Sequence, residues 1–172
     1  MSDLIQPSPW YLKVREEFRL RRRVLHKAYL SLGITKVIWT FIGGGDDGEI
    51  DESRYYDRDG NKVTPGDNLS LPEIKPTWDR RTERSDPLPR VAYVPLYQIE
   101  SAMGFGLMEL CDDSGWWNDS GGRATVEWNL IDDVFDLEVV DYIMTEGPAR
   151  RTKVVNNTIK VLDSPPAIRH DF

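Results

Sequence analysis

Cysteine and histidine are scarce in this sequence of 172 residues. Cys111 is the single cysteine, and the two histidines are His26 and His170. One cysteine excludes an internal disulfide and a multi-cysteine zinc site, which favours a reducing compartment and predicts a cytoplasmic protein. The histidines lie in a basic segment and in the C-terminal tail, where a Ser-His-Asp or Cys-His arrangement is hard to build. We therefore assign no catalytic residue.

The sequence also lacks long apolar runs. The longest, 37–42, is far shorter than the roughly 20 residues that a membrane-spanning helix needs. Residues 1–9 show no basic stretch followed by an apolar core, which is the pattern of a signal peptide. The sequence therefore predicts neither a membrane span nor a signal peptide.

Charged and aromatic residues, in contrast, are plentiful. Six Trp, seven Tyr and five Phe supply apolar area for a core, and the length suits one domain over 1–172. The net charge of −7 repels a phosphate backbone and disfavours general nucleic-acid binding. Basic residues still gather in 13–27, where Arg15, Arg19 and Arg22 lie at helical spacing. This basic helix face fits an acidic partner, a phosphate backbone or plain solvation.

Hydrophobic periodicity predicts an α+β fold. Helices are expected at 9–32 and 96–110, where apolar residues recur at helical spacing. Strands are expected where apolar residues alternate or run together, at 35–42, 49–56, 124–130, 135–144 and in a last hairpin within 153–162. Prolines and charges indicate a long irregular insertion at 64–95 and a tail at 163–172. The order gives two αββ halves, expected to form an antiparallel sheet with both helices on one face.

Two loops rich in glycine and acidic residues stand out. The first, 43–48, follows the strand 35–42, whose apolar residues on alternate faces predict burial on both sides. The second, 116–122, contains two tryptophans, which either pack in the core or present one ring as a binding hot spot. We expect the loops to lie side by side as one interaction surface, formed by Gly43, Gly45, Asp46, Asp47, Gly48, Trp116, Trp117, Asn118, Asp119 and Gly121.

The first loop also offers oxygen ligands. Asp46, Asp47 and Glu49 are neighbours in the sequence, and Asp119 would join them if the two loops adjoin. Mg²⁺ and Ca²⁺ prefer such hard ligands. The alternative is an acidic hairpin exposed to solvent, because turns select aspartate and glycine in any case. Our main expectation is no cofactor, with a Mg²⁺ or Ca²⁺ site as the alternative.

The same loops carry a family resemblance. The segment from Gly33-Ile34 through Val37 to Phe41-Ile42-Gly43-Gly44-Gly45-Asp46-Asp47-Gly48-Glu49-Ile50, and the loop Gly115-Trp116-Trp117-Asn118-Asp119-Ser120-Gly121-Gly122, resemble a bacterial and phage family of uncharacterised small domains. The shared motifs are GI-x-x-V-x-x-x-F-x-G-x-G-D-x-G-x-I and GW-x-N-x-x-G, within about 25–52 and 105–140. Trp117 stands where the family pattern has an acid, and the insertion 64–95 is longer than the family pattern leads us to expect. The resemblance implies an accessory role in phages or mobile elements and a shared loop surface, without a catalytic role.

Together these features predict an acidic, non-enzymatic interaction protein that binds a protein partner or assembly through the two loops. If it is phage-encoded, it would act in the host cytoplasm. Two other functions stay open. One is a divalent-metal-dependent enzyme acting on a phosphate-containing substrate. The other is an acidic mimic of nucleic acid that inhibits a host factor, which needs carboxylates spaced along one face.

Overall fold

The computed structural model describes residues 8–45, 47–75, 78–79, 84–85, 90–111, 121–142, 150–155 and 158–162. They belong to two compact units, each built from two separate stretches of chain. Unit 1 contains Met1–Ala28 and Gly66–Leu110, and unit 2 contains Tyr29–Pro65 and Cys111–Phe172. No single cut in the sequence separates these units, because the chain passes from one to the other three times.

Helix α1, Pro9–Ser31, has the capping signals that the sequence predicts for its two ends. The hydroxyl oxygen of Ser8 accepts a hydrogen bond from the N–H of Tyr11 at 3.1 Å, as an N-cap serine does. At the other end, the N–H of Ile34 donates to the carbonyl oxygen of Tyr29 at 2.9 Å, which is the long bond of a Schellman cap. The helix predicted over 9–32 is confirmed to within one residue.

Helix α2, Leu96–Leu110, is confirmed at the predicted residues. Its buried stripe contains Ile99, Met103 and Leu107, which recur at the spacing of one helix face. Within unit 1, Trp10 of α1 donates from its indole Nε1 to a carboxylate oxygen of Glu109 on α2 at 3.0 Å. In the described part of the chain, neither helix combines the length and the apolarity that crossing a membrane takes.

The insertion 64–95 was expected to be irregular, and this expectation is wrong for much of it. Two antiparallel strand pairs form here: β4 (Ser70–Lys75) with β7 (Arg90–Pro95), and β5 (Trp78–Asp79) with β6 (Arg84–Ser85). Pro72 lies inside β4, opposite Tyr93. A two-stranded sheet has only edge strands, where a missing N–H is tolerated. The prolines therefore do not prevent strand formation.

Unit 1 also holds an ion pair that is largely shielded from solvent. Arg21 of α1 donates from Nε and from Nη2 to the same carboxylate oxygen of Glu73 on β4, each at 3.1 Å. Glu73 is only 7% exposed. Burying a carboxylate is costly unless it is paired, so this contact fixes α1 against β4 within the unit.

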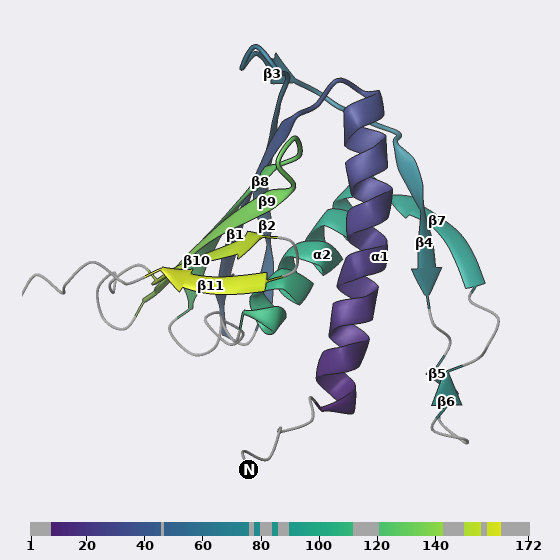
Figure 1. The fold of residues 1–172 in the computed structure, drawn as a ribbon, viewed down its shortest axis with the longest axis vertical. Coiled ribbons are helices and arrows are strands. Elements are labelled where there is room, and N and C mark those ends of the chain that lie inside the picture. The colour runs from purple at the N-terminus through teal and green to yellow at the C-terminus, as the bar shows by residue number, and fades with distance from the viewer. Residues whose placement is uncertain are drawn as a thin grey trace, which may run out of the picture. The chain divides into compact units, whose positions relative to one another are not determined.

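Unit 2 is built on an antiparallel sheet, shown in Figure 1. Its strand order is β11-β10-β9-β8-β1-β2-β3. The strands span Lys36–Gly44 (β1), Asp47–Tyr56 (β2), Lys62–Val63 (β3), Gly122–Asn129 (β8), Val134–Asp141 (β9), Arg150–Val155 (β10) and Thr158–Leu162 (β11). The chain order α1-β1-β2 and α2-β8-β9 confirms the two αββ halves, which β1 and β8 join by pairing. The α+β class is thus confirmed.

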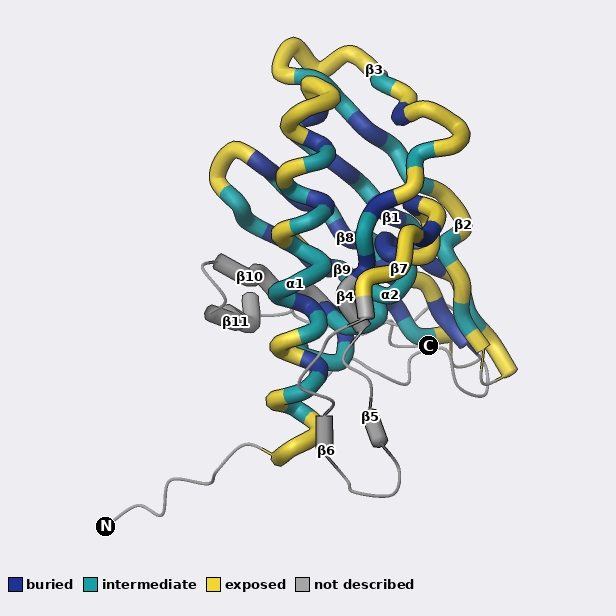
Figure 2. The backbone as a smooth tube through the Cα atoms, turned by 90° about the vertical axis from the view of Figure 1, so that its right-hand side faces the viewer, coloured by how far each residue is buried: buried dark blue, intermediate teal, exposed yellow. Residues whose placement is uncertain are grey.

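One face of this sheet forms a buried aromatic layer. Three rows cross it in register: Val37, Trp128 and Phe135; Trp39, Val126 and Leu137; Phe41, Ala124 and Val139. Figure 2 shows buried positions alternating with less buried ones along β1 and β8. The expectation that the first strand is buried on both faces is wrong, because Ile42 on its second face is 41% exposed. Apolar residues are common on protein surfaces, so an apolar run alone does not establish burial.

The turn between β2 and β3 is organised by one carboxylate. Asp57 accepts hydrogen bonds from the N–H groups of Asp59 at 2.9 Å and Asn61 at 2.8 Å, and from the side-chain amide of Asn61 at 3.0 Å. The side-chain bond from Asn61, followed by these backbone bonds, lowers the pKa of Asp57. The turn therefore selects the ionised form of Asp57.

Replacing Asn61 with alanine should raise the pKa of Asp57 toward its ordinary value, because the side-chain donor is removed. A carboxylate whose pKa is lowered by folding stabilises the folded state above its ordinary pKa. That contribution is lost as the pH falls through the lowered value. Titration of the Asp57 carboxyl carbon by NMR measures both pKa values, and an unchanged midpoint in Asn61→Ala would contradict the role given to Asn61.

Candidate functional site

The first glycine-rich loop is a tight hairpin turn. Gly44 pairs with Asp47, so Gly45 and Asp46 alone connect β1 to β2. Gly45 has a φ of 64°, as the first central residue of a two-residue hairpin turn requires. Just after the turn, the carboxylate of Asp47 accepts a hydrogen bond from the N–H of Gly48 at 2.8 Å. Asp46 itself lies outside the described residues.

The described end of the second loop lies directly beside this hairpin. Gly43 of β1 is the register partner of Gly122 of β8. Gly121 has a φ of 75°, and a Cβ built on it would overlap the carbonyl oxygen of Gly43 and lie 2.8 Å from its carbonyl carbon. The backbone of β1 therefore leaves room only for a glycine at position 121. Five residues of the expected interaction surface lie outside the described residues: Asp46 of the first loop, and Trp116, Trp117, Asn118 and Asp119 of the second.

An open hollow of about 410 Å³ lies at this end of the sheet. We call it the glycine hollow and define it by the residues that line it: Ile42, Gly43, Gly44, Asp47, Gly48, Glu49, Gly122 and Tyr142. Tyr142 is held beside β8 because its N–H donates to the carbonyl oxygen of Gly121 at 2.8 Å. The exposed apolar side chains of Ile42 and Tyr142 and the carboxylates of Asp47 and Glu49 give the hollow a mixed character.

The composition of the two loops predicts the glycines and acids of this hollow, but not Ile42 and Tyr142. Ile42 was expected to be buried, and Tyr142 was seen only as part of a strand. The contribution of Tyr142 depends on the pairing of β8 with β9, which aligns Gly122 with Asp141. No local signal reveals that register, so Tyr142 could not be found from the sequence alone.

The structure describes only two of the four residues expected to bind a metal, Asp47 and Glu49. Across the described ranges, no group of three or more His, Cys, Asp or Glu side chains is placed to hold a metal ion. One carboxylate oxygen of Asp47 accepts a hydrogen bond from the N–H of Gly48. Asp46 and Asp119 belong to the residues that the structure does not describe, so the hypothesis stays a prediction.

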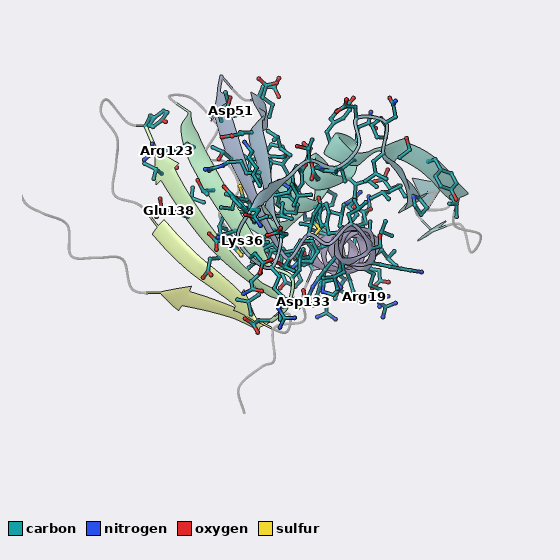
Figure 3. The ribbon with its side chains drawn as sticks, turned by 90° about the horizontal axis from the view of Figure 1, so that it is seen from above. Arg19, Lys36, Asp51, Arg123, Asp133 and Glu138 are labelled. Carbon is teal, nitrogen blue, oxygen red and sulfur yellow. The ribbon has the colours of Figure 1, made fainter. Side chains whose placement is uncertain are left out.

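The free side of β2 borders the glycine hollow. β2 pairs with β1 along its whole length, but with β3 only through Tyr55 and Tyr56. The register with β1 slips between Thr40 and Phe41, whose partners are Glu52 and Ile50, so Asp51 is the extra residue of a β-bulge. Figure 3 shows Asp51 on β2 at the margin of the sheet. The bulge was not predicted from the sequence.

The second face of the sheet carries charges of both signs. Lys36 of β1 forms an ion pair with Glu127 of β8 at 3.6 Å, and the exposed Arg123 lies on the same face. A hollow of about 280 Å³ over β8 and β9 is lined by Thr125, Glu127, Asp136, Leu137 and Glu138. The labelled Lys36, Arg123 and Glu138 in Figure 3 illustrate this mixture. Cations among the carboxylates weaken the resemblance to a row of phosphates that mimicry of nucleic acid would need.

The basic helix face belongs to α1 and unit 1. Arg19 donates from Nε to a carboxylate oxygen of Glu16 at 2.8 Å, one turn earlier. This hydrogen bond holds the pKa of Glu16 below its ordinary value. Arg15 is exposed, and Arg22 is half-buried. Because Arg19 is already paired within the helix, the stripe offers less positive charge to a phosphate backbone than its sequence indicates.

Comparisons of the chain with known family models, with curated proteins and with solved structures find no match. The resemblance to a bacterial and phage family therefore remains a prediction based on its two motifs.

Proposed function

We propose that this chain is a protein-binding module that engages a protein partner through the glycine hollow. The observation that carries the proposal is the register between Gly43 and Gly122, which brings the two glycine-rich segments to one end of the sheet. The family resemblance adds the proposal that the module serves as an accessory protein of a phage or mobile element.

The surface chemistry of the hollow supports binding of a protein. Ile42 is 41% exposed and Tyr142 is 38% exposed, and both line the same opening. Aromatic and aliphatic side chains beside a hollow are typical anchors of protein interfaces, and tyrosine is enriched among binding hot spots. Asp47 and Glu49 at the rim add polar groups that favour a partner of opposite charge.

Substituting Ile42 or Tyr142 with aspartate should weaken binding of a partner. Binders can be selected from a displayed library of protein fragments against the full chain, and their dissociation constants measured with each variant. We expect a loss of about thirtyfold, which corresponds to about 2 kcal/mol for a hot-spot residue. Both positions are exposed, so the folded state should tolerate the change, and thermal unfolding verifies this.

Ile131→Asp is the matched control. Ile131 is 64% exposed in the turn between β8 and β9 and does not line the glycine hollow. The same chemical change at this position should leave the dissociation constants unchanged. Binders whose affinity falls equally with all three variants, or with none of them, would contradict the glycine hollow as the binding surface.

A further inference from the structure

The side of β2 that faces away from β1 is an open sheet edge. Over 47–52, no described strand pairs with β2 on this side, because β3 reaches only Tyr55 and Tyr56. The backbone of an edge strand presents N–H and C=O groups to any chain that approaches in extended form. Several residues of this segment are exposed, including Asp47, Glu49 and Asp51. The edge is therefore accessible to a partner.

The charge of this edge is almost entirely negative. The segment 47–54 contains Asp47, Glu49, Asp51 and Glu52 against the single cation Arg54. Arg54 pairs with Glu52 at 3.5 Å. No described cation pairs with Glu49, and the carboxylate of Asp47 is bonded to the N–H of Gly48 rather than to a cation. The edge thus retains negative charge that a partner can neutralise.

The carboxylates also share one face. Asp47, Glu49 and Glu52 pair with Gly44, Ile42 and Thr40 of β1, which all lie on the second face of the sheet. These three partners on β1 are uncharged, so they do not neutralise the carboxylates. A strand added on the other side of β2 could do so. On the first face, Gly48 has no side chain and Ile50 is half-buried. A strand placed beside β2 would meet acids on one face and apolar space on the other.

This pattern discriminates between possible strands. A second copy of β2 would set carboxylates against carboxylates, and like charges opposite each other destabilise a pair. Natural edges use charge in this way against self-association. A strand with basic residues at every second position would place a cation near each carboxylate, since alternate side chains point to one face.

We infer that the β2 edge binds an extended basic segment of a partner protein by strand addition, with basic side chains over Asp47, Glu49 and Glu52 and small apolar side chains over Gly48 and Ile50. Strand addition derives affinity from backbone hydrogen bonds and specificity from alternate side chains. This inference rests on the proposed function and specifies its partner, because the β2 edge borders the glycine hollow.

A synthetic peptide of eight residues that alternates lysine and valine, with blocked ends, provides the probe. It should bind the full chain at low ionic strength and slow hydrogen exchange of backbone amides within 47–54. A glutamate-valine peptide of the same length should bind at least about tenfold more weakly, because every cation becomes an anion. No binding of the lysine-valine peptide up to about 1 mM, or equal binding of both peptides, would overturn the inference.

Backbone methylation separates strand addition from simple charge attraction. Two versions of the peptide, methylated on the odd or on the even amides, carry the same charge but lose the donors of opposite edges. One version should bind like the parent, and the other should lose at least about tenfold in affinity. Equal binding of both versions would show attraction without strand pairing and would overturn the inference.

Glu49→Lys tests the edge from the side of the protein. It should weaken binding of the lysine-valine peptide about tenfold. Asp67→Lys, the same charge reversal at an exposed residue of unit 1, should have little effect on this binding. Equal losses with both variants would overturn the inference. The outcome also separates the two proposals: library binders lost with Ile42→Asp but unaffected by Glu49→Lys would support the glycine hollow and refute strand addition.

Discussion

Gly121→Ala should lower the free energy of unfolding by about 3 kcal/mol or more, measured by urea denaturation. The added Cβ would overlap the carbonyl oxygen of Gly43 and lie 2.8 Å from the Cα of Gly44. Both obstacles are backbone atoms of a paired strand, so they cannot move aside as a side chain can. The φ of 75° adds strain, because residues with a Cβ rarely adopt this conformation.

Gly45→Ala separates the two contributions to that loss. Gly45 also has a positive φ, of 64°, but a Cβ there would meet no atom within 4 Å. Its substitution should therefore cost only the backbone strain, about 1–2 kcal/mol. Equal losses for the two variants would mean that the close approach of Gly121 to Gly43 is not a feature of the folded protein. The described packing of β8 beside Gly43, a residue that lines the glycine hollow, would then be wrong.

The positions of most elements could be predicted because their signals are local. Ser8 and Pro9 mark the start of α1 through groups within one turn of helix. Ala124, Val126 and Trp128 alternate with polar residues, and a strand with one buried face leaves this period of two in any sequence. Such signals do not require knowledge of which strands pair.

Features that depend on pairing could not be predicted. Nothing near 64–95 indicates that β4 and β7 meet, since the partners of each strand lie far along the chain. The bulge at Asp51 arises from a slip in register with β1 and has no glycine to mark it. The pair of Arg21 with Glu73 spans 52 residues of sequence. Each of these follows from tertiary packing, which overrides local preference.

The candidate site lies between these two cases. The two loops could be singled out by composition, and the register of Gly43 with Gly122 places their described ends together. Composition does not predict the apolar side chains of the glycine hollow. It favours a buried position for Ile42 and an ordinary strand position for Tyr142. The free edge of β2 was equally hidden, since its existence depends on how short β3 is. The exposed apolar anchors and the open edge are the features that favour a protein partner.

Trp128→Ala should lower the free energy of unfolding by about 4 kcal/mol. The Trp128 ring is fully buried, stacks on Phe135 with ring centroids 4.7 Å apart and meets Tyr29 edge-on at 6.1 Å. Its indole Nε1 donates to a carboxylate oxygen of Asp133 at 3.0 Å. Removing the ring thus leaves a cavity between three strands and removes a hydrogen bond. A loss below about 1 kcal/mol would contradict the central place of this ring in unit 2.

Two conservative variants isolate the hydrogen bond within that effect. Trp39 and Trp128 are both fully buried neighbours, with ring centroids 6.1 Å apart, but the indole Nε1 of Trp39 has no acceptor among the described residues. Trp39→Phe removes a buried donor that lacks such a partner, whereas Trp128→Phe removes the donor to Asp133, a residue held at a φ of 53°. Because both changes delete the same volume, Trp128→Phe should cost about 1–2 kcal/mol more in urea denaturation. Equal costs would show that the bond to Asp133 does not stabilise the turn between β8 and β9.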